Sequence, residues 1–356
     1  MTFLKERLLR IQQEIKKKSF DAIWIDNPVS LFYLTGYNAS AGILIIEKDI
    51  VALFLDGRYF NDAKENLSIP IFSNIEIFDY LKNKQIRKMS FDATTTTIFD
   101  LEKLKEEMKK HNNRIDFIPL VHPIKYFRMI KDENEMKILK EAAQIGWQGF
   151  LYVQSLLKEG ITEEDIALEF EIFCRKKGAE KMSFPPIIAF GANSSYPHYK
   201  TGKSKLKKDD IVLMDLGVVY KNYCSDMTRI CFVGTPHPQL QRLYYITRKA
   251  QKEALAYCRA NTTIKELDLK ARSIMKEANV EDLFIHGLGH GVGLDVHEPP
   301  SIKHDSVDCD LQLEENMVIT IEPGLYLPGI GGVRYEDTII IKKNGYENLY
   351  PEDNEI

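Results

Sequence analysis

The chain has few cysteines, and their spacing gives no sign that they are joined. The five cysteines show no CxxC spacing, and an odd, sparse set favours free thiols in a reducing compartment over a disulfide framework. The sequence also lacks the long apolar run of a signal peptide or a membrane span, because charged residues crowd its start and polar residues interrupt 27–46. We therefore expect a cytoplasmic protein with no membrane partner.

An excess of charge of either sign is missing as well. Lysine and arginine number 48 against 52 aspartate and glutamate, so the net charge is 48 − 52 = −4. This balance gives no electrostatic reason to expect a nucleic-acid partner. With 44% hydrophobic and 28% charged residues, the composition is that of a soluble globular protein, and 356 residues allow two domains.

The apolar pattern changes character around Pro123–Lys131, and we place a domain boundary there, giving domains 1–125 and 126–356. The first part mixes short apolar runs with helical spacing, which indicates a small α/β domain. Its expected strands are Ala22–Ile25, Gly42–Ile46 and Ile50–Leu55, and its expected helices are 1–19, Pro28–Leu34, Tyr59–Asn66 and Asp100–Lys110.

The second part predicts an α+β domain, with helices packed on a mostly antiparallel sheet. The expected helices are Glu133–Leu157, Thr162–Phe173, Gln239–Arg259 and Ile264–Ala278. The expected strands are Pro186–Phe190, Ile211–Val219, Asp226–Val233, Met317–Ile321 and Asp337–Ile341.

Histidine is scarce, yet three of the eight histidines fall between His286 and His297, with four glycines interleaved. Histidine binds metals and moves protons near neutral pH, and glycine lets a backbone approach a site closely. A phosphate-binding loop is disfavoured, because the glycines do not fit GxGxxG and no P-loop lysine follows. A helical HExxH zinc site is disfavoured too, because the central glutamate is absent.

Two aspartates follow apolar residues on adjacent predicted strands. With a two-residue turn at Tyr220–Lys221, Asp215 would lie opposite Asp226, close enough for both carboxylates to share metal ions. A turn shifted by one residue would make the pair diagonal. A solvated aspartate on each strand is the plainer alternative, but a buried Asp215 would need a partner or a cation.

Two glutamates extend the set. Glu322 ends an apolar strand before a Pro-Gly turn, and the period of two would bring Arg334 and Glu336 to one face of a single strand. An Arg–Glu surface pair is the alternative for the latter two. Four carboxylates and a histidine cluster in one half of the chain favour a metal centre.

Taken in order, these motifs resemble the metallopeptidases of the pita-bread fold, which include methionine aminopeptidase, aminopeptidase P and prolidase. The resemblance covers most of residues 130–345 and rests on Asp215–Gly217, Ser225–Arg229, His286–Glu298, Ile321–Gly324 and Gly332–Asp337. In the first part, Leu31–Tyr37 and Leu55–Tyr59 look like the creatinase-type N-terminal domain of the proline-directed branch. The resemblance implies a catalytic pita-bread domain preceded by a smaller creatinase-like α/β domain.

The resemblance also implies a dinuclear metal centre. Asp215 would bind one ion, Asp226 and Glu336 would bridge both, and His290 and Glu322 would complete the other site. Oxygen ligands with one imidazole suit Mn²⁺, our first choice, with Co²⁺ or Zn²⁺ as alternatives. Two such ions, about 3.5–4 Å apart in enzymes of this kind, activate water and polarise the scissile carbonyl.

The remaining roles come from the same resemblance. Glu322 would also be the general base. His198, His286, His297 and Arg334 would bind the substrate, and His198, His297 and Arg334 would take part in catalysis.

The activity expected from the resemblance is that of an Xaa-Pro aminopeptidase acting on peptides with proline in second position. The alternative is an Xaa-Pro dipeptidase (prolidase), which needs a free carboxylate directly after proline. An alternative of another class is a catalytically silent pita-bread domain that binds a partner protein, against which the intact ligand set argues. The family resemblance also implies a homodimer.

Overall fold

The computed structural model describes residues 3–351 and divides the chain into two compact units, Met1–Arg128 and Met129–Ile356. Within the described residues, no helix combines the length and apolar character that crossing a bilayer requires.

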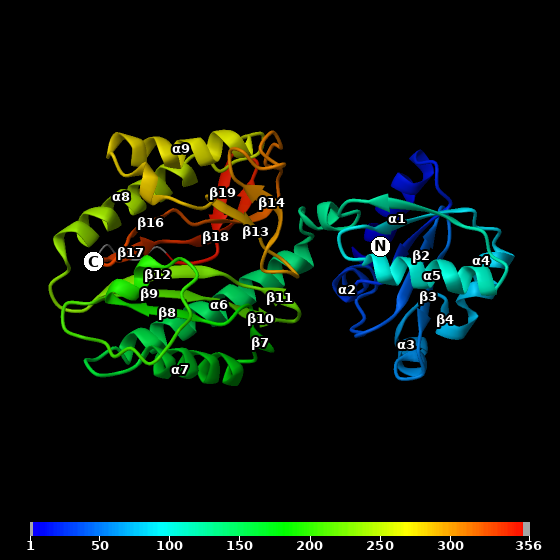
Figure 1. Ribbon diagram of the computed structural model, residues 1–356, viewed down its shortest axis with the longest axis horizontal. Coiled ribbons are helices and arrows are strands. Elements are labelled where there is room, and N and C mark those ends of the chain that lie inside the picture. Colours follow the sequence, from blue (N-terminus) through cyan, green and yellow to red (C-terminus); the bar gives the residue numbers. More distant parts are fainter. Residues whose placement is uncertain (1–2, 352–356) are drawn as a thin grey trace. The chain divides into compact units, whose positions relative to one another are not determined.

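The first unit is built on one mixed sheet of six strands in the order β4-β3-β2-β1-β5-β6 (Figure 1). Strand β1 pairs antiparallel with β2 and parallel with β5, as expected of an α/β domain. The strands are β1 (Ala22–Ile25), β2 (Ile43–Glu47), β3 (Val51–Leu55), β4 (Ile71–Ser73), β5 (Lys88–Asp92) and β6 (Asp116–Leu120). The helices are α1 (Phe3–Lys17), α2 (Pro28–Thr35), α3 (Phe60–Asn66), α4 (Ile77–Asn83) and α5 (Ile98–Lys110), with 3₁₀ turns η1 (Asn74–Glu76) and η2 (Lys125–Arg128).

Helix α2 illustrates how local sequence sets an element's bounds. The Asn27 side chain caps the helix by accepting from the Ser30 N–H, and Pro28 occupies the first turn, where its missing N–H does no harm. Gly36 ends the helix at φ 71°, a left-handed conformation that glycine adopts without a Cβ penalty. The sequence predicted this helix to within one residue.

The second unit places two helix pairs on opposite sides of its strands, with α8 and α9 on one side and α6 and α7 on the other (Figure 1). The helices are α6 (Glu133–Ser155), α7 (Glu163–Lys176), α8 (Pro238–Leu255) and α9 (Ile264–Glu277), with 3₁₀ turns η3 (Gly191–Ser195) and η4 (Glu281–Leu283). The strands are β7 (Lys181–Met182), β8 (Ile187–Phe190), β9 (Ile211–Leu216), β10 (Val218–Tyr220), β11 (Tyr223–Cys224), β12 (Met227–Phe232), β13 (Gly289–Gly291), β14 (Glu298–Ile302), β15 (Val318–Ile321), β16 (Gly324–Leu327), β17 (Gly331–Arg334), β18 (Asp337–Lys342) and β19 (Gly345–Asn348).

All strand pairs of this unit are antiparallel, as the sequence predicted. The sheets have the orders β12-β9-β8, β14-β13-β15-β18-β19, β11-β10-β7 and β16-β17. An isolated bridge between Thr228 and Glu336 links β12 to the start of β18.

Strand β9 is buried on both faces, which explains its continuous apolar run. Ile211 and Leu213 belong to the core under α8 and α9, whereas Val212 and Met214 belong to the core under α6 and α7. Side chains alternate along a strand, so Asp215 lies on the face of Ile211 and Leu213. A carboxylate is thereby placed at the edge of an apolar core.

The turn of the hairpin that follows β9 lies one residue later in the chain than the sequence predicted. Tyr220 pairs with Tyr223, so the turn is Lys221–Asn222, and Asp215 opposes Thr228 instead of Asp226. Lys221 and Asn222 have φ of 47° and 70°. A two-residue hairpin turn with both central residues at positive φ favours asparagine over an aromatic residue such as Tyr220. The two aspartates are therefore diagonal neighbours.

A second correction concerns Arg334 and Glu336, which do not share a strand. Arg334 ends β17, in the small β16-β17 sheet, while Glu336 lies directly before β18 in the five-stranded sheet. The chain changes sheet between them, so their proximity does not come from strand periodicity.

Candidate metal centre

The five predicted ligands come from five different strands or strand ends. Asp215 lies in β9, and His290 is the middle residue of β13. Asp226 directly precedes β12, Glu322 directly follows β15, and Glu336 directly precedes β18. Strand ends leave side chains free of the sheet's two packed faces, and Pro323 prevents the ladder from continuing past Glu322.

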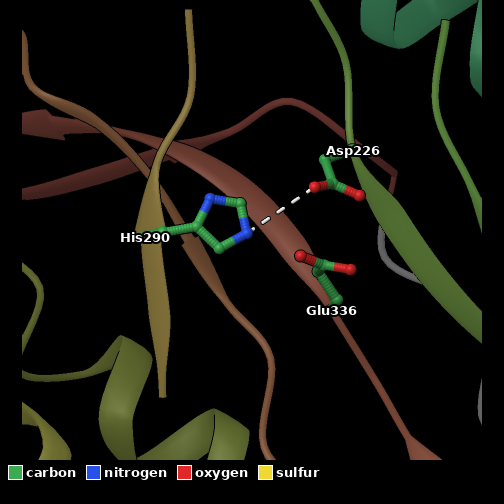
Figure 2. Close-up of side chains that lie close together, drawn as sticks. All are labelled: Asp226, His290 and Glu336. Atoms are coloured by element: carbon green, nitrogen blue, oxygen red, sulfur yellow. Dashed lines mark ion pairs between the residues drawn. The ribbon is translucent and has the colours of Figure 1, made fainter. Parts of the chain in front are cut away.

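The structure brings these side chains together. Asp226, His290 and Glu336 offer ligand atoms that all lie within 4.8 Å of one another, and Figure 2 shows the three side chains turned toward one point. The His290 Nε2 lies 3.7 Å from an Asp226 oxygen and 3.6 Å from a Glu322 oxygen. Asp215 is tied to the cluster through Arg334, whose Nη2 donates to its Oδ2 at 2.6 Å.

Burial and mutual repulsion make the carboxylates resist ionisation. Burial, and then the neighbouring carboxylates, raise the pKa of Asp226 and of Glu336 well above their ordinary values. Burial raises the pKa of Glu322 to about 8, although Arg334 opposes the rise. Like charges gathered in a buried site favour the protonated form unless a cation neutralises them.

His290 is arranged as a neutral ligand. Burial, followed by the neighbouring His297, lowers its pKa to about 4. Its Nδ1 lies 3.0 Å from the Gly291 carbonyl oxygen, so Nδ1 carries the hydrogen and Nε2 directs a lone pair toward the carboxylates. A lone pair facing two carboxylates is unfavourable without a cation between them.

The residues therefore fit divalent cations. Besides the neutral His290, the buried Oδ1 of Asp215 has no hydrogen-bond partner among the described residues. A buried carboxylate oxygen left without a donor is costly, and a metal ion would satisfy it. Oxygen ligands with one imidazole match the chemistry of Mn²⁺, Co²⁺ or Zn²⁺.

Arg334 is held by the chain itself. Besides Asp215, its guanidinium donates to the Tyr326 hydroxyl at 2.7 Å, to Thr228 Oγ1 at 3.1 Å and to the Pro197 carbonyl at 3.4 Å. These contacts fix its charge beside the carboxylates.

The other predicted histidines take different positions. His286 Nε2 lies 3.0 Å from the Tyr326 hydroxyl and its Nδ1 lies 2.8 Å from the Gly287 carbonyl, so both ring nitrogens are engaged. His297 is exposed, with its ring centroid 4.3 Å from that of His290. His198 is exposed in the turn after η3, close enough to Asp215 and His297 for its charge to act on both.

Sequence reasoning missed the residues that hold the ligands. Thr228 Oγ1 donates to Glu336 at 2.8 Å, and Tyr350 and Thr338 donate to the Asp226 carbonyl at 2.8 and 2.7 Å. Thr228 could have been found, because it stands two residues after Asp226 on a strand and shares its face. Tyr326, Thr338 and Tyr350 meet the site only through tertiary structure, and no local pattern marks them.

The pKa shifts predict how the metal-free protein responds to pH. A carboxyl group whose pKa is higher in the folded than in the unfolded chain keeps its proton longer when folded, so stability falls as pH rises between the two values. For Glu322 this window runs from its ordinary 4.5 to about 8. His286 and His290, whose pKa values are lowered by burial from 6.5, are neutral in both states above that value.

We therefore expect the chelated protein to melt at a lower temperature at pH 8.5 than at pH 7. Differential scanning fluorimetry measures this directly. Glu322→Gln is the matched control, and its melting temperature should depend less on pH over the same interval. An equal or higher melting temperature at pH 8.5 in the chelated parent would show that the carboxylates are not held as described.

Comparison with known proteins finds relatives over nearly the whole chain. The model of metallopeptidase family M24 matches residues 137–343, and that of the creatinase/prolidase N-terminal domain matches residues 7–130. An Xaa-Pro dipeptidase of Pyrococcus furiosus is 35% identical over 99% of this chain and 100% of its own length. The chain belongs to metallopeptidase family M24, as its motifs indicated.

Solved structures share the fold. An Xaa-Pro dipeptidase from Bacillus anthracis has a TM-score of 0.93 and 33% identity, covering 99% of both chains. An X-Pro aminopeptidase from Thermotoga maritima has a TM-score of 0.87 and 31% identity, covering 97% of this chain and 98% of its own. The predicted pita-bread architecture with a creatinase-like N-terminal domain is confirmed, and the chain is a metal-dependent peptidase.

Proposed function

We propose that this protein is an Xaa-Pro dipeptidase that hydrolyses the bond between a first residue and a C-terminal proline. The observation that carries the proposal is the full-length similarity to proteins named Xaa-Pro dipeptidase, together with the five ligand residues. The aminopeptidase expected from the sequence is not confirmed, and the comparisons favour its alternative. Family membership and the ligand set also speak against a silent binding module.

Asp215, Asp226, His290, Glu322 and Glu336 would hold two divalent ions, with Mn²⁺ as the first candidate. When bound, such ions lower the pKa of water and polarise the carbonyl to be attacked. Glu322 would then be ionised near neutral pH, because nearby cations favour its charged form and offset the burial, and the repulsion by Asp215, that raise its pKa. It can take a proton from the attacking water and deliver it to the departing proline nitrogen, which needs a proton to leave.

The substrate side of the site is formed by exposed histidines. Arg334 is occupied by Asp215, Thr228 and Tyr326, which leaves His198 and His297 as candidates to contact the reacting carbonyl and the free carboxylate of a dipeptide. His286 and Arg334 support this side by fixing Tyr326 between them. The homodimer implied by the family resemblance stays a proposal, which light scattering of the purified protein can test.

A substrate series tests the proposal. We expect Mn²⁺-loaded protein to cleave Ala-Pro at least about 10-fold faster than Ala-Pro-Ala, because a hydrogen bond to a charged group contributes about 1.5–3 kcal/mol and the tripeptide lacks a carboxylate at that position. Ala-Ala, which has a free carboxylate but no proline, is the control that tests the preference for proline. Faster cleavage of Ala-Pro-Ala would return the assignment to an aminopeptidase, and equal rates for Ala-Pro and Ala-Ala would remove the proline preference.

A further inference from the structure

A second buried carboxylate lies outside the metal cluster. Glu163, the first residue of α7, is fully buried. Its Oε1 accepts from the Phe190 N–H at 2.9 Å and from Asn193 Nδ2 at 2.8 Å. Its Oε2 accepts from the Tyr199 hydroxyl at 2.9 Å and from the Gly202 N–H at 3.2 Å. Four donors match the acceptor capacity of one ionised carboxylate.

All four donors belong to one stretch of chain, residues 190–202. This stretch, here called the 190–202 segment, leaves β8, makes the turn η3 and carries the exposed His198. Residues at both ends of the segment and in its middle donate hydrogen bonds to the Glu163 carboxylate. Glu163 is therefore a single buried side chain that holds this segment at four points.

The opposite side of the segment rests on the strand that carries Arg334. The Gly332 N–H donates to Ser194 Oγ at 2.8 Å, and a Cβ at Gly332 would lie 2.3 Å from the Ser194 carbonyl oxygen. Arg334 donates to the Pro197 carbonyl at 3.4 Å. The 190–202 segment is therefore fixed between Glu163 on one side and β17 on the other, with His198 next to the second contact.

We propose that Glu163 is a positioning residue, which holds the 190–202 segment so that His198 stays beside the carboxylate cluster. The proposal rests on the proposed function in one respect, namely that His198 contacts the substrate. Within the described part of the chain, none of the side-chain hydrogen bonds of Glu163 goes to one of the five proposed metal ligands. Its carboxylate acts through the backbone of Phe190 and Gly202 and the side chains of Asn193 and Tyr199.

Replacement by glutamine tests this role, because it keeps the shape but turns one acceptor into a donor that faces other donors. We expect Glu163→Gln to lower kcat/KM for Ala-Pro about 10-fold, with metal content unchanged. In a His198→Ala background the same change should lower it less than about 2-fold, since coupled residues are non-additive. Glu164→Gln is the matched control, with the same chemistry on the adjacent, exposed residue. An equal loss in both backgrounds would overturn the proposal.

Hydrogen–deuterium exchange gives a readout that is independent of activity. Amides of the 190–202 segment should exchange faster in Glu163→Gln than in the parent or in Glu164→Gln, while those of β9 should not. Unchanged exchange in the segment would contradict the proposal even if the enzyme proved inactive on Ala-Pro. Failure of the parent to cleave Ala-Pro would instead contradict the proposed function alone.

Tyr199→Phe provides a second variant if Glu163→Gln does not fold. It keeps the ring and removes only one of the four donors, so we expect a smaller loss of about 3-fold that again disappears without His198. A loss that persists in the His198→Ala background would contradict the positioning role.

Discussion

Replacement of Asp226 by asparagine is expected to abolish metal binding and hydrolysis together. An amide is neutral and offers one acceptor oxygen where the carboxylate offers two, so it cannot serve two cations. It would also point an NH₂ group toward Glu336 or His290. Metal ions contribute several kcal/mol to the stabilisation of charge in the transition state, so the rate on Ala-Pro should fall at least about 10³-fold. Elemental analysis and a rate assay on the same preparation measure both effects.

The metal-free form of this variant adds a discriminating check. Burial and the neighbouring carboxylates raise the pKa of Asp226, so its ionised form disfavours the metal-free fold. Metal-free Asp226→Asn should therefore be at least as stable at pH 8.5 as the metal-free parent. Asp310→Asn, at an exposed position, is the control and should leave metal content, rate and stability unchanged. Retention of two ions by Asp226→Asn would contradict its assignment as a bridging ligand.

Replacement of His297 by alanine should separate catalysis from metal binding. The residue is exposed, and its ring packs edge-on against His290, one of the proposed ligands, with 4.3 Å between the ring centroids. We expect the variant to keep its metal and to lose about 10²–10⁴-fold in kcat, the range for a group that moves a proton or stabilises the transition state.

The control for this variant is His111→Ala, in the first unit, where the ring stacks on Phe78. It should keep full activity. If His297→Ala instead lost its metal ions while His111→Ala kept them, His297 would belong to the ligands and His290 would need another role.

The grouping of these five side chains could be anticipated because Asp215 and Glu322 each end an apolar run, and the other three lie in short motifs whose order resembles that of the family. The glycines on either side of His290 have a structural reason of their own. A Cβ at Gly289 would lie 2.1 Å from the Thr320 carbonyl oxygen, and one at Gly291 would lie 2.2 Å from that of Pro299. Close approach of the neighbouring strands therefore requires both glycines, whereas the sequence suggested only a close approach of backbone to a site.

The two wrong predictions, the hairpin turn and the strand shared by Arg334 and Glu336, used local sequence patterns where other parts of the fold decide the structure. The predicted turn was wrong by one residue, which moved the partner of Asp215 from Asp226 to Thr228. Apolar alternation alone did not decide between the two turns, whereas the positive φ of Asn222 did. Arg334 and Glu336 looked like neighbours on one strand, but the chain moves to another sheet between them. The contacts of Glu163 could not be predicted from the sequence, because its four donors lie 27 to 39 residues further along the chain.

Substrate choice lay beyond the motifs for a different reason. The ligand set describes how a peptide bond is hydrolysed, and an aminopeptidase and a dipeptidase can share it. The distinction depends on what faces the group after proline, and the ligand motifs do not describe that part of the site. Exposed loops vary in sequence and carry no periodic pattern, so their conformation cannot be read from spacing.

The central claim is that five side chains from separate strands bind two divalent ions. A crystal of the Mn²⁺-loaded protein, measured at the manganese absorption edge, tests it most directly. We predict two anomalous peaks, with Asp226 and Glu336 contacting both, Asp215 contacting one, and His290 and Glu322 completing the other. Peaks absent from this cluster, or ions held by His198, His286 or His297 in place of these residues, would contradict it.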